Sequence, residues 1–143
     1  MNITFEVAKS SNYPGDDYDL VTFFDCFHDM GDPVGAAKYV LHTLKKKPGT
    51  WMLVEPFANN QLEDNLNPLG RVFYPASSLI CVPASLNENG PALGAQASEH
   101  RTMEIMKTAG FSKIRCATQT PFNLVLEANP KLLIFQLGKV IEG

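Results

Sequence analysis

The chain has 143 residues, of which 45% are hydrophobic and 19% charged, so it can form one folded domain and is too apolar to be disordered. The formal net charge of −3 argues against the basic surface that nucleic-acid binding requires. No apolar run reaches the ~20 residues of a membrane span, and no signal peptide is recognisable. Cys26, Cys81 and Cys116 lie far apart without a CxxC pair, so we expect reduced thiols, no metal site and a cytoplasmic protein without membrane partners.

The first half of the chain shows alternating strand and helix signals. Residues 3–7 alternate between apolar and polar side chains, which predicts a strand. Residues 18–24 are almost continuously apolar, as in a strand of a parallel sheet that is buried on both faces. Asp32 as N-cap and Pro33 as first residue predict a helix that ends at Pro48. A second buried strand, residues 51–54, follows and ends at Glu55.

The second half begins with a long segment that lacks this pattern. Residues 57–97 contain helical patches, internal prolines and a Gly/Pro/Asn loop, and their apolar content argues against disorder. We expect them to form a cap over a site. Residues 101–109 predict a helix, and residues 113–118 and 123–128 an antiparallel hairpin. Residues 132–141 form an apolar tail, either a strand or a short helix. The sum predicts an α/β sheet with right-handed crossovers.

Polar residues follow the ends of two strands that we expect to be neighbours. In open α/β sheets, ligands bind outside the carboxyl ends of the strands, where His28 and Glu55 would then lie together. A histidine can accept a proton from a substrate hydroxyl while a carboxylate holds its tautomer. Simpler interpretations remain open: Asp29 and Asp32 cap the following helix, His28 binds a loop carbonyl, and Glu55 merely ends its strand.

Four stretches together resemble a known family. They are "YDLVTFFDCFHDMGDP", "GTWMLVEPF", "RTMEIMKTAGFSKIRCA" and "NLVLEA". They look like the C-terminal half of a class I S-adenosylmethionine-dependent methyltransferase, of the bacterial small-molecule type. The resemblance implies a truncated Rossmann-like sheet, mostly parallel with an antiparallel C-terminal hairpin. Residues 1–130 would be a partial methyltransferase domain with a cap insertion at 57–97, and residues 131–143 an apolar C-terminal tail.

The resemblance also implies site residues and a reaction. His28 would be the general base in methyl transfer to a small-molecule hydroxyl, with Glu55 beside it and Glu99 as a further acidic residue before the last helix. S-adenosylmethionine would contact Ala8, Lys9, Ser10, Phe24 and Asp25. Lys9 stands where the family often has an acidic acceptor, and a lysine can only donate.

The family's Gly-rich GxGxG turn is not found among these residues. We therefore expect weak or no cofactor binding and no activity from this chain alone. The alternative is a non-enzymatic module, derived from a methyltransferase, that serves assembly or binds a small ligand. The second half of a nicotinamide-dependent enzyme fits less well, because that class lacks the hairpin and the "TAGF" helix. Without the first half, the strand at 19–24 would have a bare edge, so we expect a homo-oligomer.

Overall fold

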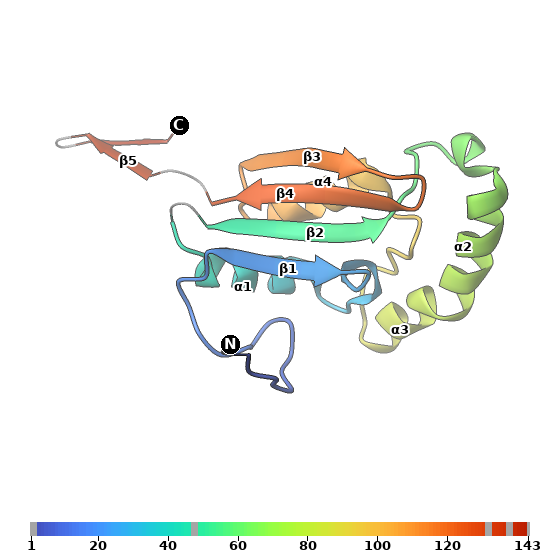
Figure 1. Cartoon of the computed structure of the whole chain (residues 1–143), viewed down its shortest axis with the longest axis horizontal. Coiled ribbons are helices and arrows are strands. Elements are labelled where there is room, and N and C mark those ends of the chain that lie inside the picture. Colours follow the sequence, from blue (N-terminus) through green and yellow to red (C-terminus); the bar gives the residue numbers. More distant parts are fainter. Residues whose placement is uncertain (1–2, 47–48, 131–132, 137–138, 143) are drawn as a thin grey trace.

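The computed structural model of the chain describes residues 3–46, 49–130, 133–136 and 139–142 (Figure 1). Its strands are β1 Leu20–Phe24, β2 Thr50–Pro56, β3 Lys113–Gln119, β4 Asn123–Asn129, β5 Leu133–Gln136 and β6 Lys139–Glu142. Its helices are α1 Pro33–Thr43, α2 Pro68–Leu79, α3 Cys81–Asn87 and α4 Ser98–Thr108, and short 3-10 turns occur at Phe27–Asp29 and Glu63–Asn65.

Four strands form one mixed sheet in the order β1-β2-β4-β3. β1 and β2 run parallel, from Leu20 opposite Thr50 to Phe24 opposite Val54, and β4 is antiparallel to both β2 and β3. Helices α1 and α4 lie together behind the sheet in Figure 1. The α/β fold class and the C-terminal hairpin predicted from the sequence are confirmed.

The core lies between this sheet and its two helices. Trp51, Leu53 and Leu126 alternate inward from β2 and β4 and are fully buried, as expected for the period-two pattern of a strand. The indole of Trp51 is surrounded by the rings of Phe23, Phe27 and Phe111, whose centroids lie 5.2–5.4 Å away. This aromatic cluster anchors β1, β2 and the 3-10 turn together, and so fixes where the two strands end.

The strand predicted at residues 3–7 is wrong. The segment pairs with no strand among the described residues, and the side chains of Phe5 and Val7 are fully exposed. Alternation favours a strand only where a neighbouring strand offers backbone partners and a face to cover. In the described part of the chain, β1 therefore has β2 as its only partner and remains an edge strand, as the bare-edge prediction requires.

The C-terminal tail forms the β5–β6 hairpin, with Leu133 opposite Glu142 and Gln136 opposite Lys139. The sequence predicted either a strand or a short helix here, and the described residues form strands. Residues 131–132, 137–138 and 143 of the predicted tail lie outside the described residues.

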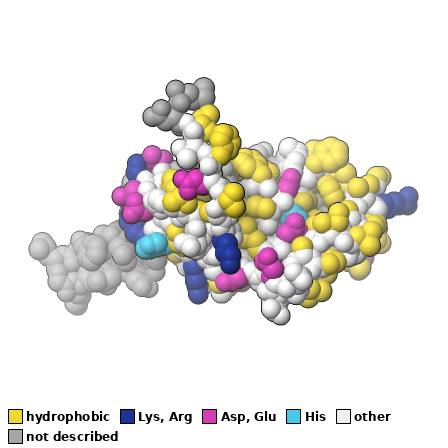
Figure 2. Space-filling model, turned by 90° about the horizontal axis from the view of Figure 1, so that it is seen from below, with side chains coloured by type: hydrophobic (Ala, Val, Ile, Leu, Met, Phe, Trp, Pro, Cys, Tyr) yellow, Lys and Arg dark blue, Asp and Glu magenta, His cyan; other side chains and the backbone are white. Residues whose placement is uncertain are grey.

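The cap, residues 57–97, lies beyond the end of the sheet where β1 and β2 finish (Figure 1). The helical patches predicted there become α2 and α3. Asn67 caps α2 by accepting from the backbone N–H groups of Leu69 and Gly70, and Pro68 occupies the first helical position, where no donor is needed. The cap leaves much apolar surface exposed, seen at the right of Figure 2; its large exposed side chains are Leu62, Leu66, Val72, Leu79, Ile80 and Leu86.

Candidate active site

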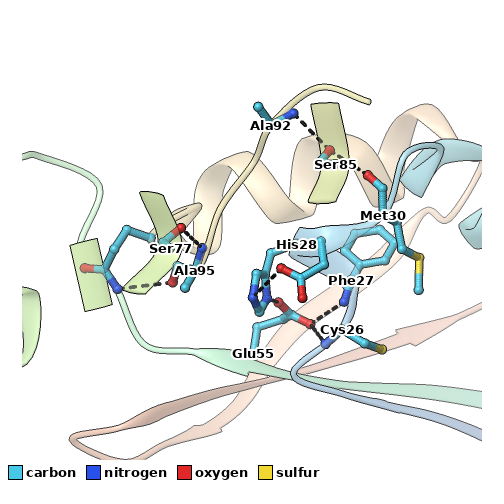
Figure 3. Close-up of polar contacts among 11 residues, drawn as sticks. Cys26, Phe27, His28, Met30, Glu55, Ser77, Ser85, Ala92 and Ala95 are labelled. Atoms are coloured by element: carbon cyan, nitrogen blue, oxygen red, sulfur yellow. Dashed lines mark hydrogen bonds and ion pairs between the residues drawn. The ribbon is translucent and has the colours of Figure 1, made fainter. Parts of the chain in front are cut away.

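His28 and Glu55 form a buried pair where β1 and β2 end (Figure 3). Glu55 is near the end of β2, and His28 is in the 3-10 turn that follows β1. Asp25, with a left-handed φ of 45°, turns the chain out of β1 and toward that 3-10 turn. His28 is 5% exposed and Glu55 4%, and a hydrogen bond joins Nδ1 of His28 to Oε2 of Glu55. The structure thus brings together the two residues that the sequence paired.

The second oxygen of Glu55 is held by the backbone of the turn. Oε1 accepts from the N–H of Phe27 at 2.9 Å and from that of Cys26 at 3.3 Å. A buried carboxylate with these donors stays in place and stays an acceptor. His28 therefore donates from Nδ1, which leaves Nε2 with a lone pair directed away from Glu55.

A second carboxylate faces that lone pair. Oδ1 of Asp29 lies 3.1 Å from Nε2 of His28. Burial lowers the pKa of His28, but the hydrogen bond to Glu55 and the negative charges of Glu55, Asp29 and Asp25 outweigh it, so the pKa is raised above its usual 6.5. The ring is therefore a stronger proton acceptor than an isolated histidine.

The structure distinguishes between the simpler roles that the sequence left open for Asp29, Asp32 and His28. Asp32 does cap α1, since its Oδ1 accepts from the N–H of Gly35 at 2.7 Å. Asp29 does not cap that helix and lies against His28 instead. The ring of His28 is hydrogen-bonded to a carboxylate and not to a loop carbonyl. Glu99 lies in the first turn of α4, and no described hydrogen bond joins it to His28 or Glu55.

Two of the predicted cofactor contacts, Lys9 and Ser10, lie beside this rim. They line a cavity of about 760 Å³ that Cys26 and Asp29 also line. Ala8 lines a different cavity, of about 640 Å³, beside Tyr39. Phe24 is 60% exposed at the end of β1, and Asp25 is exposed in the turn that follows. The structure therefore places Lys9 and Ser10 at the cavity beside the rim, whereas Ala8 lines a second cavity that Lys9 also lines.

Hydrogen bonds join the cap to the rim. The hydroxyl of Ser85, fully buried on α3, donates to the carbonyl of Met30 at 2.9 Å and accepts from the N–H of Ala92 at 3.1 Å (Figure 3). The N–H of Gly94 donates to the carbonyl of His28 at 3.3 Å. The cap is therefore tied to the same turn that carries His28.

Two glycines face each other at this junction. A Cβ on Gly90 would lie 2.6 Å from Cα of Gly31 and 2.8 Å from the carbonyl oxygen of Met30. A Cβ on Gly31 would collide with Cβ of Glu88. Only glycine at both positions allows the end of α3 to approach the rim this closely.

Cys81, the first residue of α3, is the site residue that the sequence did not reveal. Its thiol contacts the side chains of Asp29 and Ser77, and burial together with Asp29 raises its pKa. The Cys81 thiol, a ring nitrogen of His28 and a carboxylate oxygen of Asp29 all lie within 4.8 Å of one another. Cys81 is far from His28 in the sequence, and its residue type was the only signal available.

No family model and no curated protein matches the sequence, but its fold recurs in solved methyltransferases. Human N-acetylserotonin methyltransferase, solved with S-adenosylmethionine, has a TM-score of 0.60 and 18% identity over 88% of this chain and 33% of that chain. PigF, solved with S-adenosylhomocysteine, gives 0.62 and 17% over 84% of this chain and 32% of its own.

An O-methyltransferase family protein from Burkholderia thailandensis gives a TM-score of 0.58 and 15% identity over 88% of this chain and 35% of its own. This chain spans about a third of the length of these proteins. They share its fold. No helix among the described residues is long and apolar enough to cross a membrane.

Proposed function

We propose that the chain belongs to the S-adenosylmethionine-dependent O-methyltransferases and carries the acceptor side of their reaction, with a small-molecule hydroxyl as substrate. The buried His28–Glu55 pair at the strand ends carries this proposal. The shared fold supports it, because the neighbours include methyltransferases solved with S-adenosylmethionine and S-adenosylhomocysteine.

In this proposal His28 is the base. Glu55 holds the Nδ1 proton, and Nε2 accepts the proton of the substrate hydroxyl as its oxygen attacks the methyl carbon. Glu55 stabilises the imidazolium that forms, and its two backbone donors prevent it from following the ring. The low exposure of His28 and Glu55, and the hydrogen bond from the cap to the carbonyl of His28, support a role of the cap in keeping water from the pair. S-adenosylmethionine, when bound, supplies the electrophilic methyl group.

The described residues fit one side of a cofactor site. Ser10 and Lys9 line the cavity next to the rim, and Phe24 offers an exposed ring at the end of β1. The sequence contains no GxG turn that would let a backbone approach the methionine end of the cofactor. We therefore propose that this chain alone binds the cofactor weakly or not at all and transfers no methyl group.

Cofactor and acceptor binding can be tested on the chain as it is. In ¹H–¹⁵N spectra, S-adenosylhomocysteine should shift only amides near residues 8–10 and 24–25, without saturating at micromolar concentration. A phenolic acceptor should shift residues 26–31, and the His28→Asn variant should lose that shift while the exposed-site control His100→Asn keeps it. Micromolar cofactor binding would contradict the partial-site proposal, and phenol shifts unaffected by His28→Asn would contradict the base.

Methyl transfer itself needs the rest of the fold. The chain can be fused to the part of the Burkholderia neighbour that it does not match, with S-adenosylhomocysteine calorimetry to confirm a folded cofactor site. In a fusion that methylates a phenol, His28→Asn should lower kcat by roughly 10²–10⁴-fold with little change in KM. A full rate in His28→Asn would exclude His28 as the base.

A homo-oligomer is the partner that the fold favours. β1 is an edge strand with exposed Leu20 and Phe24, and such an edge is a template for pairing with another strand. We propose that two chains associate along β1. This observation also favours the second candidate function, an assembly module without catalysis, which the fusion assay separates from the first.

A further inference from the structure

We propose that Nε2 of His28, the carboxylate of Asp29 and the thiolate of Cys81 form a binding site for Zn²⁺ or a similar divalent transition metal. The three residues come from the rim and from the cap, and their ligand atoms lie within 4.8 Å of one another. The inference rests on this geometry and is independent of the methyl transfer proposed above.

The side chain of Asp29 carries a buried oxygen without a hydrogen-bond donor. Oδ1 of Asp29 is buried and accepts no hydrogen bond, yet it lies 3.1 Å from Nε2 of His28. Because Nδ1 donates to Glu55, Nε2 of the neutral ring is also an acceptor. Two lone pairs that face each other at this distance repel unless a cation, either a proton on Nε2 or a metal ion, lies between or beside them. Buried acceptors without partners are rare, and a missing ion is one of their recognised explanations.

The three ligand atoms are of kinds that bind transition metals. An imidazole nitrogen, a thiolate sulfur and a carboxylate oxygen are the ligands that Zn²⁺ takes in proteins. Mg²⁺ and Ca²⁺ prefer oxygen ligands throughout, so a thiol and an imidazole together disfavour them. Three protein ligands leave the fourth position of a tetrahedral site open, and Asp29 borders the cavity of about 760 Å³ from which a water or small ligand can reach it.

The residues around His28 also suit a metal ligand. A histidine that binds a metal usually donates its other ring nitrogen to a carboxylate, which fixes its orientation and raises its basicity. Glu55 does this for His28, and two backbone N–H groups hold Glu55 in turn. His28 is thus already oriented for a ligand at Nε2.

Metal binding would link the cap to the rim, because Cys81 begins α3 whereas His28 and Asp29 belong to the turn after β1. The thiol proton would pass to solvent as the sulfur–metal bond forms. The metal and a substrate proton would compete for the same atom, Nε2. A bound Zn²⁺ would therefore inhibit any reaction in which His28 acts as a base.

Cobalt(II) is the direct probe. The 143-residue chain, stripped with a chelator, should bind one equivalent of Co²⁺ and develop visible d–d bands together with a near-ultraviolet thiolate-to-cobalt band. Excess Zn²⁺ should abolish both. Cys81→Ser should remove the thiolate band, and Asp29→Asn should weaken Zn²⁺ binding in calorimetry. The half-buried thiol of Cys116 offers a matched control, since Cys116→Ser should leave the spectrum unchanged.

Glu55→Gln tests the outer shell separately and should weaken Zn²⁺ binding by roughly 10–100-fold. Circular dichroism of each variant without metal identifies any that fails to fold. Absence of Co²⁺ bands in the native chain, or a thiolate band that survives Cys81→Ser, would overturn the proposal. Neither measurement involves cofactor or acceptor. A chain that binds no metal could therefore still belong to a methyltransferase, and a fusion without methyl transfer could still bind metal.

Discussion

The sheet layer and the cap are stabilised in opposite ways. The largest fully buried side chains of the sheet layer are apolar apart from Thr43, with Trp51, Leu53 and Leu126 among them, whereas the cap contributes only Ser85 to that group. The cap's other buried polar residues, Asn65 and Ser77, hold its loops through hydrogen bonds. Most of its large apolar side chains face outward.

This difference suggests that the sheet layer and the cap have different roles at the site, and that the sheet layer is the more rigid of the two. Hydrophobic burial is proportional to area and fixes β1 and β2 firmly, so the His28–Glu55 pair rests on rigid strands. Hydrogen bonds contribute less each, about 1 kcal/mol, so a cap that depends on them can open without unfolding the sheet.

The largest effect should follow removal of the central indole. Trp51→Ala leaves a cavity in the aromatic cluster and should lower the free energy of unfolding by roughly 3–5 kcal/mol, measured by urea denaturation. Leu79→Ala, an exposed position on α2, should change it by less than about 0.5 kcal/mol. Similar losses in the two variants would contradict the division between sheet and cap.

Breaking the buried pair should come next. Glu55→Ala leaves His28 and the N–H groups of Cys26 and Phe27 without their acceptor, and should destabilise the protein by about 3 kcal/mol. Glu55→Gln keeps an amide oxygen for the backbone donors and should cost less. Equal losses in both variants, measured by urea denaturation, would mean that the charge and not the backbone contacts decides the effect.

The same pair should make stability depend on pH. The pKa of His28 in the folded protein is raised above 6.5, so its stabilising contribution is fully present below pH 6.5 and is lost as the pH rises through the folded value. With a chelator present, the stability gap between the native chain and Glu55→Ala should therefore narrow from pH 6 toward pH 9. A gap that widens would contradict the direction of the shift.

A local effect is expected within the cap. The side chain of Asn65 accepts from the N–H of Asn59 at 2.8 Å and donates to the carbonyls of Asn59 and Gln61 at 3.0 and 2.9 Å. Asn65→Ala should cost roughly 2 kcal/mol, confined to residues 57–97 in hydrogen-exchange measurements. Gln61→Ala, an exposed side chain beside it, is the control. Faster exchange in β2 or β4 would show that the cap and the sheet unfold together.

The smallest effect on stability is expected at the open edge. Leu20→Lys with Phe24→Lys should change the free energy of unfolding by less than about 0.5 kcal/mol, since both side chains are exposed. The same change should convert the proposed oligomer to monomer in light scattering, because charges on an edge strand oppose pairing. Leu79→Lys on the cap should leave the mass unchanged. A native chain that is already monomeric at micromolar concentration would refute association along β1.

The sequence predicted those elements whose pattern is set locally. The Asp32–Pro33 helix start and the closing hairpin each depend on neighbours in the chain, and both were found. The run at 18–24 does contain strand β1, but its predicted burial on both faces is wrong, because Leu20 and Phe24 are exposed at the edge of the sheet. Residues 3–7 show the limit, because their alternation says nothing about whether a partner strand is present. The bounds of α2 were not predicted, because Pro68 and Pro75 interrupt the helical pattern. Pro68 is in fact the first residue of the helix, directly after the Asn67 cap.

The site residues also differ in how far the sequence could predict them. His28 and Glu55 could be paired because parallel neighbours end at one edge of a sheet, which is a rule of topology. The approach of Cys81 to Asp29 depends on the path of the cap, which no periodicity encodes. Nor did the sequence show that Asp29 would lie against His28 and leave the capping of α1 to Asp32 alone.

The contact between Gly31 and Gly90 has a consequence for tracing descent. Since any larger residue at either position would push α3 away from the rim, a lineage that keeps this cap must keep both glycines together. A homologue with alanine at one of them has either moved its cap or lost it. The residues at positions 31 and 90 could thus distinguish homologues that keep the cap against the rim from those that do not.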